Sequence, residues 1–198
     1  MTGLTDPQEI ERTHFLDCLS LLDLGCVTSA RSLVDVGSGA GLPALVLAVA
    51  LPSVKIVAVE SRRKKCAYIG RATEALRLRN VEVYCVRAEE YGRNLGRGAY
   101  DVVVSRALAA LAVVAEYSLP LLAVGGTMVA MKGAISDQER TQAEKALGIL
   151  GSELLEAVRL QPFSGAQNRW VYLARKIRVT PSDYPRRPGI PAKRPLGG

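Results

Sequence analysis

One carboxylate and three glycines at alternate positions form the segment of this chain best suited to bind a small molecule. Asp35 ends a short apolar, β-favouring run, and the glycines that follow are Gly37, Gly39 and Gly41. Glycine lacks a Cβ, so the backbone can adopt φ > 0 and approach a ligand closely. The N–H groups that open the next helix favour an electron-rich group. Asp35 can accept hydrogen bonds from the loop amides or from a ligand ammonium group.

The spacing of these glycines separates two kinds of nucleotide-binding turn. A dinucleotide fingerprint has the pattern Gly-x-Gly-x-x-Gly and holds a pyrophosphate, and the spacing here disfavours a nicotinamide dehydrogenase. The pattern Asp-x-Gly-x-Gly-x-Gly, with Leu42 next, resembles motif I of the doubly wound methyltransferases that use S-adenosyl-L-methionine (AdoMet). The alternative is a structural glycine turn that binds no ligand.

Further polar side chains stand at the ends of predicted strands. Glu60 closes an apolar run about 20 residues after the glycines, where nucleotide-binding sheets place an acid on the ribose. Ala88 and Glu89 follow the next strand and are candidates to border an adenine. Arg106 follows the fourth strand, at the point of a doubly wound sheet where ligands bind. The alternative for Glu60 is a surface acid at the end of a strand that binds no ligand.

Alternation of apolar runs and helical periodicity predicts an α/β fold. We expect a doubly wound, mostly parallel, seven-stranded sheet whose last strand pair is antiparallel. The predicted strands are 32–36, 55–60, 81–86, 100–105, 127–131, 154–161 and 170–176. The predicted helices are 7–24, 44–51, 61–79, one that Arg106 opens, and 136–150. Gly125 and Gly126 are expected to turn into the fifth strand.

The first predicted helix carries a polar pair. His14 and Asp17 lie three residues apart and therefore share one face. His14 is the only histidine in the chain, and a structural hydrogen-bonding role is the alternative to a functional one.

The net charge of +7 is unevenly distributed. Residues 169–198 carry eight basic side chains and one acidic one, and residues 61–106 carry eleven basic and five acidic ones. Such grouping indicates a polyanion partner, with nucleic acid favoured because the basic segments flank the proposed site. A solvated surface with a basic tail is the alternative. Five prolines after Thr180 predict an extended arm without regular structure.

The remaining composition excludes several classes of protein. No apolar stretch reaches about 18 residues, so we expect no membrane span, and the polar N-terminus is unlike a secretory signal. We interpret the four cysteines as free thiols in a reducing compartment and expect no metal site, because they lack metal-ligand spacing. They are Cys18, Cys26, Cys66 and Cys85. These observations favour a cytoplasmic protein, which we expect to be a monomer.

The ordered set of motifs resembles the small-subunit (16S) ribosomal RNA guanine-N7 methyltransferase family. The matching segments are His14-x-x-Asp17, Asp35 to Pro43, Glu60-Ser61 with Lys64-Lys65, Ala88-Glu89, Ser105-Arg106-Ala107, Met131-Lys132-Gly133 and the proline-rich stretch from Thr180 to Pro191. The resemblance implies an N-terminal helix over 1–24 that starts later than is usual in the family. It further implies an AdoMet-dependent methyltransferase domain over 25–178 and a basic C-terminal arm over 179–198.

The resemblance also implies roles for individual residues. The glycine turn with Leu42, Ala88, Glu89 and Arg106 would contact AdoMet, and Glu60 would bind its ribose. His14, Asp17, Arg106 and Lys132 would face the guanine and its phosphates. The basic residues expected on 16S ribosomal RNA, naked or within the small subunit, are Arg62, Lys64, Lys65, Arg186 and Arg187.

The predicted chemistry requires few catalytic groups. Guanine N7 has a lone pair and no proton, so methyl transfer needs alignment, which supplies roughly 7–11 kcal/mol, and no general base. Ser105-Arg106-Ala107 differs from the Asn/Asp-Pro-Pro-aromatic motif of enzymes that methylate exocyclic amines. We predict that Arg106, with Lys132, orients the base. A small-molecule methyltransferase and a non-catalytic RNA-binding module are the alternatives.

Overall fold

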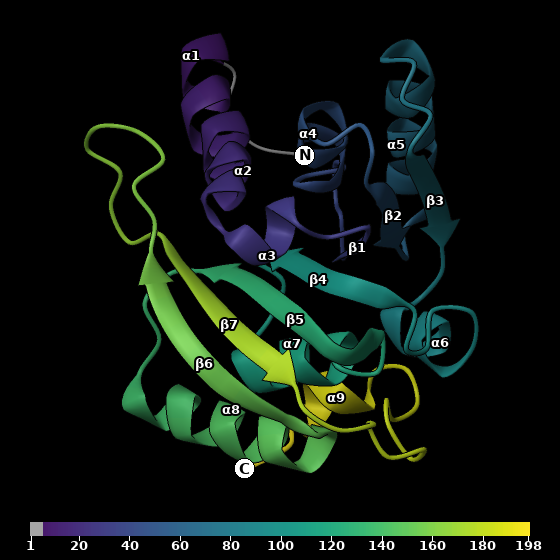
Figure 1. Ribbon diagram of the computed structural model, residues 1–198, viewed down its shortest axis with the longest axis vertical. Coiled ribbons are helices and arrows are strands. Elements are labelled where there is room, and N and C mark those ends of the chain that lie inside the picture. The colour runs from purple at the N-terminus through teal and green to yellow at the C-terminus, as the bar shows by residue number, and fades with distance from the viewer. Residues whose placement is uncertain (1–5) are drawn as a thin grey trace.

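The computed structural model describes residues 6–198, and within them a seven-stranded sheet has the order β3-β2-β1-β4-β5-β7-β6 (Figure 1). The strands are β1 (Ser32–Val36), β2 (Lys55–Glu60), β3 (Val81–Cys85), β4 (Tyr100–Arg106), β5 (Leu122–Lys132), β6 (Ser152–Arg159) and β7 (Trp170–Lys176). β1 to β5 are parallel, and β7 runs antiparallel between β5 and β6. The predicted doubly wound sheet with an antiparallel last pair is confirmed.

Helices cover both faces of the sheet. They are α1 (Pro7–Ile10), α2 (Asp17–Leu19), α3 (Gly25–Thr28), α4 (Ala44–Ala50), α5 (Arg63–Ala75), α6 (Ala88–Arg93), α7 (Leu111–Ser118), α8 (Asp137–Leu150) and α9 (Ile190–Lys193). Side chains from α4 and α5 pack with Leu33 and Ile56 on one face, whereas α7 and α8 pack with Val34 and Val57 on the other. The central strands are mostly apolar because both of their faces are buried.

The first predicted helix, 7–24, is one helical stretch with changing geometry. A π-helix over Glu11–Leu16 joins α1 to α2, and a 3-10 turn over Ser20–Asp23 follows. Residues 1–5 of the N-terminal segment expected over 1–24 lie outside the described residues. Among those that are described, no helix is long and apolar enough to cross a membrane.

Three predicted boundaries are corrected. The helix predicted over 61–79 ends at Ala75, and Arg77 then adopts φ 53°. Arg106 is the last residue of β4 and does not open a helix, because α7 begins only at Leu111. The glycine pair predicted to precede the fifth strand lies inside β5, which begins at Leu122.

The C-terminal arm corrects a further expectation. It contains the short helix α9, and it packs against the protein, with Tyr184 and Leu196 in contact with the core on the α7 side. Figure 1 shows this yellow segment close to α6 and α7. The prolines limit regular structure to α9, and the contacts described below hold the rest in place.

Candidate active site

A cleft with a volume of about 650 Å³ lies at the carboxyl ends of β1, β2 and β4. Most of the residues predicted to bind AdoMet line it, together with three predicted to face RNA. They are Gly37, Gly39, Leu42, Glu60, Ala88, Glu89 and Arg106, with His14, Arg62 and Lys65 also on the wall. Asp35 and Gly41 are not part of this lining. The structure therefore brings these residues together from five separate segments.

The glycine turn after β1 has the backbone that the spacing predicts. Gly37, Gly39 and Gly41 have φ values of 74°, 59° and 86°, a region that other residues rarely adopt. A Cβ on Gly37 would lie 2.5 Å from Cδ1 of Leu108, and one on Gly41 would lie 2.6 Å from Cδ1 of Leu45. Glycine at 37 avoids a clash with Leu108 on the cleft wall, whereas glycine at 41 lets the turn pack against Leu45 of α4.

Asp35 supports the turn from behind and does not face the cleft. Its side chain is fully buried, accepts a hydrogen bond from Ser38 Oγ at 2.5 Å and accepts another from the Ala44 amide at 3.2 Å. Burial raises the pKa of Asp35 to about 6, and the Ser38 hydrogen bond opposes that shift. Asp35 thus ties the glycine turn to the start of α4.

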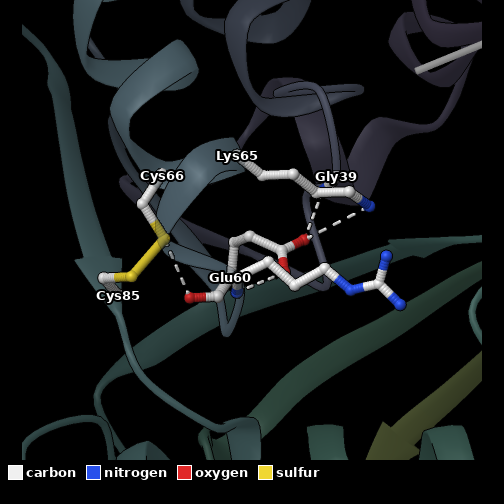
Figure 2. The surroundings of a disulfide bond; sticks show 6 residues. Gly39, Glu60, Lys65, Cys66 and Cys85 are labelled. Atoms are coloured by element: carbon white, nitrogen blue, oxygen red, sulfur yellow. Dashed lines mark hydrogen bonds and ion pairs between the residues drawn. A yellow bond between two sulfur atoms is a disulfide. The ribbon is translucent and has the colours of Figure 1, made fainter.

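Glu60, at the end of β2, also lines the cleft, and Figure 2 shows its carboxylate next to Gly39. Its carboxylate accepts hydrogen bonds from the backbone amides of Gly39 at 3.0 Å and Arg62 at 2.9 Å. Lys65 Nζ lies 4.0 Å away. These contacts hold the carboxylate in one orientation beside the glycine turn, where it can accept hydroxyl hydrogen bonds from a ribose.

The prediction of four free thiols is wrong for two of them. Cys66, in the first turns of α5, and Cys85, at the end of β3, form a disulfide beside Glu60 (Figure 2). The pairing follows from sheet order, because Glu60 and Cys85 are register partners on β2 and β3. Cys18 and Cys26 are free, and burial raises the pKa of the Cys18 thiol to about 12.

Glu89 lies in the first turn of α6 and is almost completely buried, with 2% of its surface exposed. Its Oε1 accepts a hydrogen bond at 2.9 Å from the amide of Gly189, in the C-terminal arm. The side chain therefore joins the cleft wall to a segment a hundred residues later in the chain.

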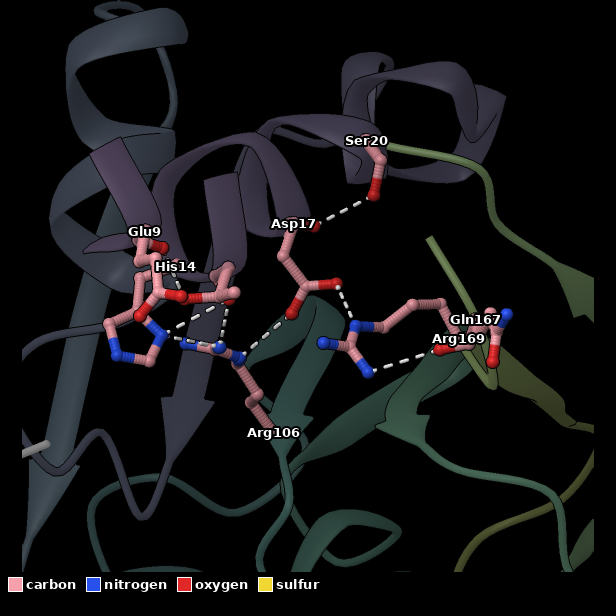
Figure 3. A network of polar contacts seen from close by, with 8 residues as sticks. Glu9, His14, Asp17, Ser20, Arg106, Gln167 and Arg169 are labelled. Atoms are coloured by element: carbon pink, nitrogen blue, oxygen red, sulfur yellow. Dashed lines mark hydrogen bonds and ion pairs between the residues drawn. The ribbon is translucent and has the colours of Figure 1, made fainter. Parts of the chain in front are cut away.

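The N-terminal helix meets Arg106 at one end of the cleft, where Figure 3 shows the network between them. Arg106 donates from Nε to Asp17 Oδ2 at 3.1 Å and from its terminal nitrogen to the carbonyl oxygen of Thr13 at 2.7 Å. The same nitrogen lies 2.9 Å from His14 Nδ1. His14 and Asp17 therefore lie on one face, as predicted, and both contact Arg106. In the described part of the chain, His14 Nε2 is buried without a hydrogen-bond partner.

A second cavity of about 490 Å³ adjoins the cleft and shares Arg106, Ala107 and Leu108 with it. Asp17 and Lys132 line it, as do three residues that the sequence did not single out: Asn168, Arg169 and Trp170. Arg169 Nε lies 3.2 Å from Asp17 Oδ1 (Figure 3). Trp170 reaches this position because β7 pairs with β5 opposite Lys132, a neighbourhood that only the strand order reveals.

Lys132 is held by the protein at the edge of this second cavity. Its Nζ donates to the carbonyl oxygen of Ala109 at 2.7 Å and lies 3.1 Å from Glu139 Oε1. Glu139 also accepts a hydrogen bond from the Leu111 amide at the start of α7. The lysine is therefore close to the space that Arg106 faces, with its charge partly balanced.

The basic residues expected on RNA fall into two groups. Arg62, Lys64 and Arg187 are exposed, whereas Lys65 is half-buried beside Glu60. The prediction for Arg186 is corrected, because its guanidinium pairs with the fully buried Glu116 at 2.6 Å. That contact gives Arg186 a role within the protein.

The strand order, the glycine turn and the cleft at the carboxyl ends of the strands define the fold of the class I AdoMet-dependent methyltransferases. A SAM-dependent O-methyltransferase from Thermotoga maritima superimposes with a TM-score of 0.60 at 17% identity, over 91% of this chain and 69% of its own. TrmN from Thermus thermophilus gives a TM-score of 0.62 at 20% identity, over 81% of this chain and 48% of its own.

The chain belongs to the rRNA small subunit methyltransferase G family, whose model matches residues 1–165. Ribosomal RNA small subunit methyltransferase G of Pelotomaculum thermopropionicum is 43% identical over 99% of this chain and 82% of its own length. The protein of the same name from Moorella thermoacetica is 40% identical with the same coverage. The family resemblance of the sequence motifs is confirmed.

Proposed function

We propose that this protein transfers a methyl group from AdoMet to N7 of a guanine in 16S ribosomal RNA. The observation that carries the proposal is the position of Arg106, which lines both the glycine-turn cleft and the second cavity beside it. A donor in the first space and a base in the second would meet at this residue. Membership of the family supports ribosomal RNA as the substrate.

The first cleft fits AdoMet by the chemistry of its walls. Gly37 and Gly39 let the backbone approach the cofactor, Leu42 adds an apolar wall, and the fixed carboxylate of Glu60 would accept the ribose hydroxyls. At the other end, Ala88 and Glu89 would border the adenine, with the carboxylate of Glu89 accepting from its amino group. Asp35 acts on this site through Ser38 and Ala44, which it holds in place.

The second cavity would take the guanine. AdoMet, when bound, supplies an electrophilic methyl group on a sulfonium. N7 of guanine has a free lone pair, so the protein has no proton to remove and contributes alignment and charge. Arg106, fixed by Asp17 and the Thr13 carbonyl, would orient the base and offset the developing charge. Lys132 would assist from the rim of the cavity, and His14 would face the substrate beside Arg106.

RNA outside the cavity would contact the exposed cations next to the cleft. Arg62 and Lys64 stand at the start of α5 without a described acidic partner. Positive charge at a helix N-terminus costs a few tenths of a kcal/mol or more, so a binding role accounts for its presence. Lys65 at the cleft wall and Arg187 in the arm extend this basic surface. We propose that the protein works as a monomer in the cytoplasm, on naked RNA or on the small subunit.

Methyl transfer from labelled AdoMet into unmodified small ribosomal subunits tests the proposal, with nucleoside mass spectrometry of the product. Label recovered as 7-methylguanosine establishes the donor, the acceptor and the modified atom together. AdoMet binding with label on a different nucleoside would overturn the N7 assignment. Failure to bind AdoMet would overturn the assignment of the cleft. Transfer to small molecules but not to RNA would favour the alternative methyltransferase class.

A further inference from the structure

The C-terminal arm is fastened to the two helices that border one end of the cofactor cleft. From α6 and the loop after it, Arg93 donates to the Pro185 carbonyl at 2.7 Å, and Arg97 donates to the carbonyls of Tyr184 at 2.7 Å and Thr180 at 2.8 Å. Each of these bonds joins a side chain from the end of α6, or the loop after it, to backbone in the arm. The arm is therefore held in a defined position relative to α6.

The strongest attachment is the pair formed by Arg186 and Glu116. The Glu116 side chain on α7 is fully buried and accepts hydrogen bonds from the Arg186 amide at 2.8 Å and from its guanidinium at 2.6–3.1 Å. Arg186 also donates to the carbonyl oxygen of Arg194 at 2.7 Å. Bidentate pairs of this kind set geometry as well as supplying energy. Arg186 is thus fixed to α7 through its backbone amide and its side chain, and it ties the backbone at Arg194 to the same point.

Three residues further on, the arm reaches the cleft wall. Gly189 donates its amide to Glu89 Oε1, and the turn that presents this amide is closed by a hydrogen bond from Ile190 to Arg187 at 3.0 Å. Gly189 has φ 82°, a backbone that favours glycine. Within the described residues, no protein donor meets the other oxygen, Oε2, so this atom is free to accept from a ligand.

We propose that Arg186 is a positioning residue for cofactor binding. Through its pair with Glu116 it fixes the amide of Gly189, and this amide holds the Glu89 carboxylate at the angle needed for the adenine amino group. The inference rests on the proposed function, in which Glu89 accepts that hydrogen bond. The C-terminal arm then sets how well the cleft recognises adenine, although none of its residues lines the cleft.

The test compares two ligands that differ at the purine 6-position, which Glu89 would contact, and in the proton on the adjacent N1. S-Adenosylhomocysteine carries the 6-amino donor, and its deaminated analogue S-inosylhomocysteine carries a 6-oxo acceptor that a carboxylate repels. Loss of a charge-assisted hydrogen bond corresponds to about a 10- to 150-fold change in Kd. We expect calorimetry on the full chain to show such a preference for the amino ligand in the wild type.

Arg186→Met should reduce this ratio of Kd values toward 1, and Arg186→Lys, which keeps a charge for Glu116, should restore part of it. Arg194→Met is the matched control, because it removes the same charge from an exposed side chain in the same arm. Should Arg186→Met fail to fold, Gly189→Ala serves instead, since it keeps the ion pair and disturbs the amide through its positive φ.

Equal weakening of both ligands in Arg186→Met, with an unchanged ratio, would mean that Arg186 is only structural and would overturn the proposal. Absence of any preference in the wild type would overturn it in a different way, because the adenine role of Glu89 would then be wrong. A ratio that falls in Arg186→Met and stays at the wild-type value in Arg194→Met supports it.

Discussion

Arg106 donates to Asp17 at 3.1 Å across 89 positions of the chain. This contact fastens the N-terminal helix to the end of the central strand β4, and it lies where the cofactor cleft and the second cavity meet. Asp17 is buried and is also approached by Arg169. The residue proposed to orient the base is thus held by the helix that covers it.

Replacement of Arg106 by alanine should lower turnover at saturating AdoMet and RNA by about 10²-fold or more, the usual effect of losing one preorganised donor. Arg106→Lys should retain part of the activity, because it keeps the charge but loses the fork of donors. Single-turnover methylation measures the effect. A thermal melt checks that the variant is still folded, because the substitution leaves the buried Asp17 without its Arg106 partner. Full turnover in Arg106→Ala would show that the base is oriented by other groups.

Glu60→Gln should raise the Kd for AdoMet by about 10- to 150-fold, because a neutral amide replaces a charge-assisted acceptor. Calorimetric titration of AdoMet measures this change. Glu153→Gln, on an exposed residue of β6, is the matched control and should bind as the wild type does. An unchanged Kd in Glu60→Gln would move the ribose to another part of the cleft.

Asp35 predicts a specific pH dependence of stability. Burial raises its folded-state pKa from 3.8 to about 6, so the folded protein binds this proton more tightly than the unfolded chain. The resulting stabilisation is present below about pH 4 and is lost as the pH rises through about 6. Wild type should therefore gain about 2 kcal/mol relative to Asp35→Asn between pH 7 and pH 4.

Urea unfolding of both proteins across this pH range measures their free energies of unfolding. The difference between the two values cancels the contributions of the other titrating groups, which both proteins share. A difference in free energy of unfolding that does not change with pH would show that Asp35 titrates at its ordinary pKa.

The cations at the start of α5 should contribute to RNA affinity through counterion release. The logarithm of the RNA association constant falls linearly with the logarithm of the salt concentration, by roughly 0.7 for each phosphate contact on single-stranded RNA. The double variant Arg62→Ala with Lys64→Ala should therefore make this slope less steep by about 1.4. Filter binding to a 16S fragment between low and moderate salt measures the slope. The control is Arg140→Ala with Lys145→Ala on α8, which should leave it unchanged.

Sequence patterns were sufficient for most of the strands and for most of the cleft, although β5 begins five residues before its predicted start. Strands buried on both faces read as continuous apolar runs, so β2 and β7 were predicted to the residue, and the glycine turn specifies its own backbone. Helix ends were less accurate where no breaker marks them, as at Ala75. The π-helix carries no local signal; it presents the Thr13 carbonyl to Arg106, a contact made across the fold.

Contacts between distant segments account for the remaining errors. The Cys66–Cys85 disulfide depends on β2 and β3 being neighbours, and the basic appearance of Arg186 gave no indication of its buried partner on α7. Arg169 and Trp170 belong to the second cavity only because β7 lies beside β5. Local patterns predict elements, whereas these partners follow from how the elements are arranged.

Trp170 gives this protein an intrinsic optical reporter. It is the only tryptophan in the chain and lies on the wall of the cavity proposed for the guanine, not on the wall of the cofactor cleft. Excitation at the red edge of indole absorption selects it over the seven tyrosines. Quenching of its emission would follow arrival of the methyl acceptor without any label, so acceptor and donor binding can be timed separately in the unmodified enzyme.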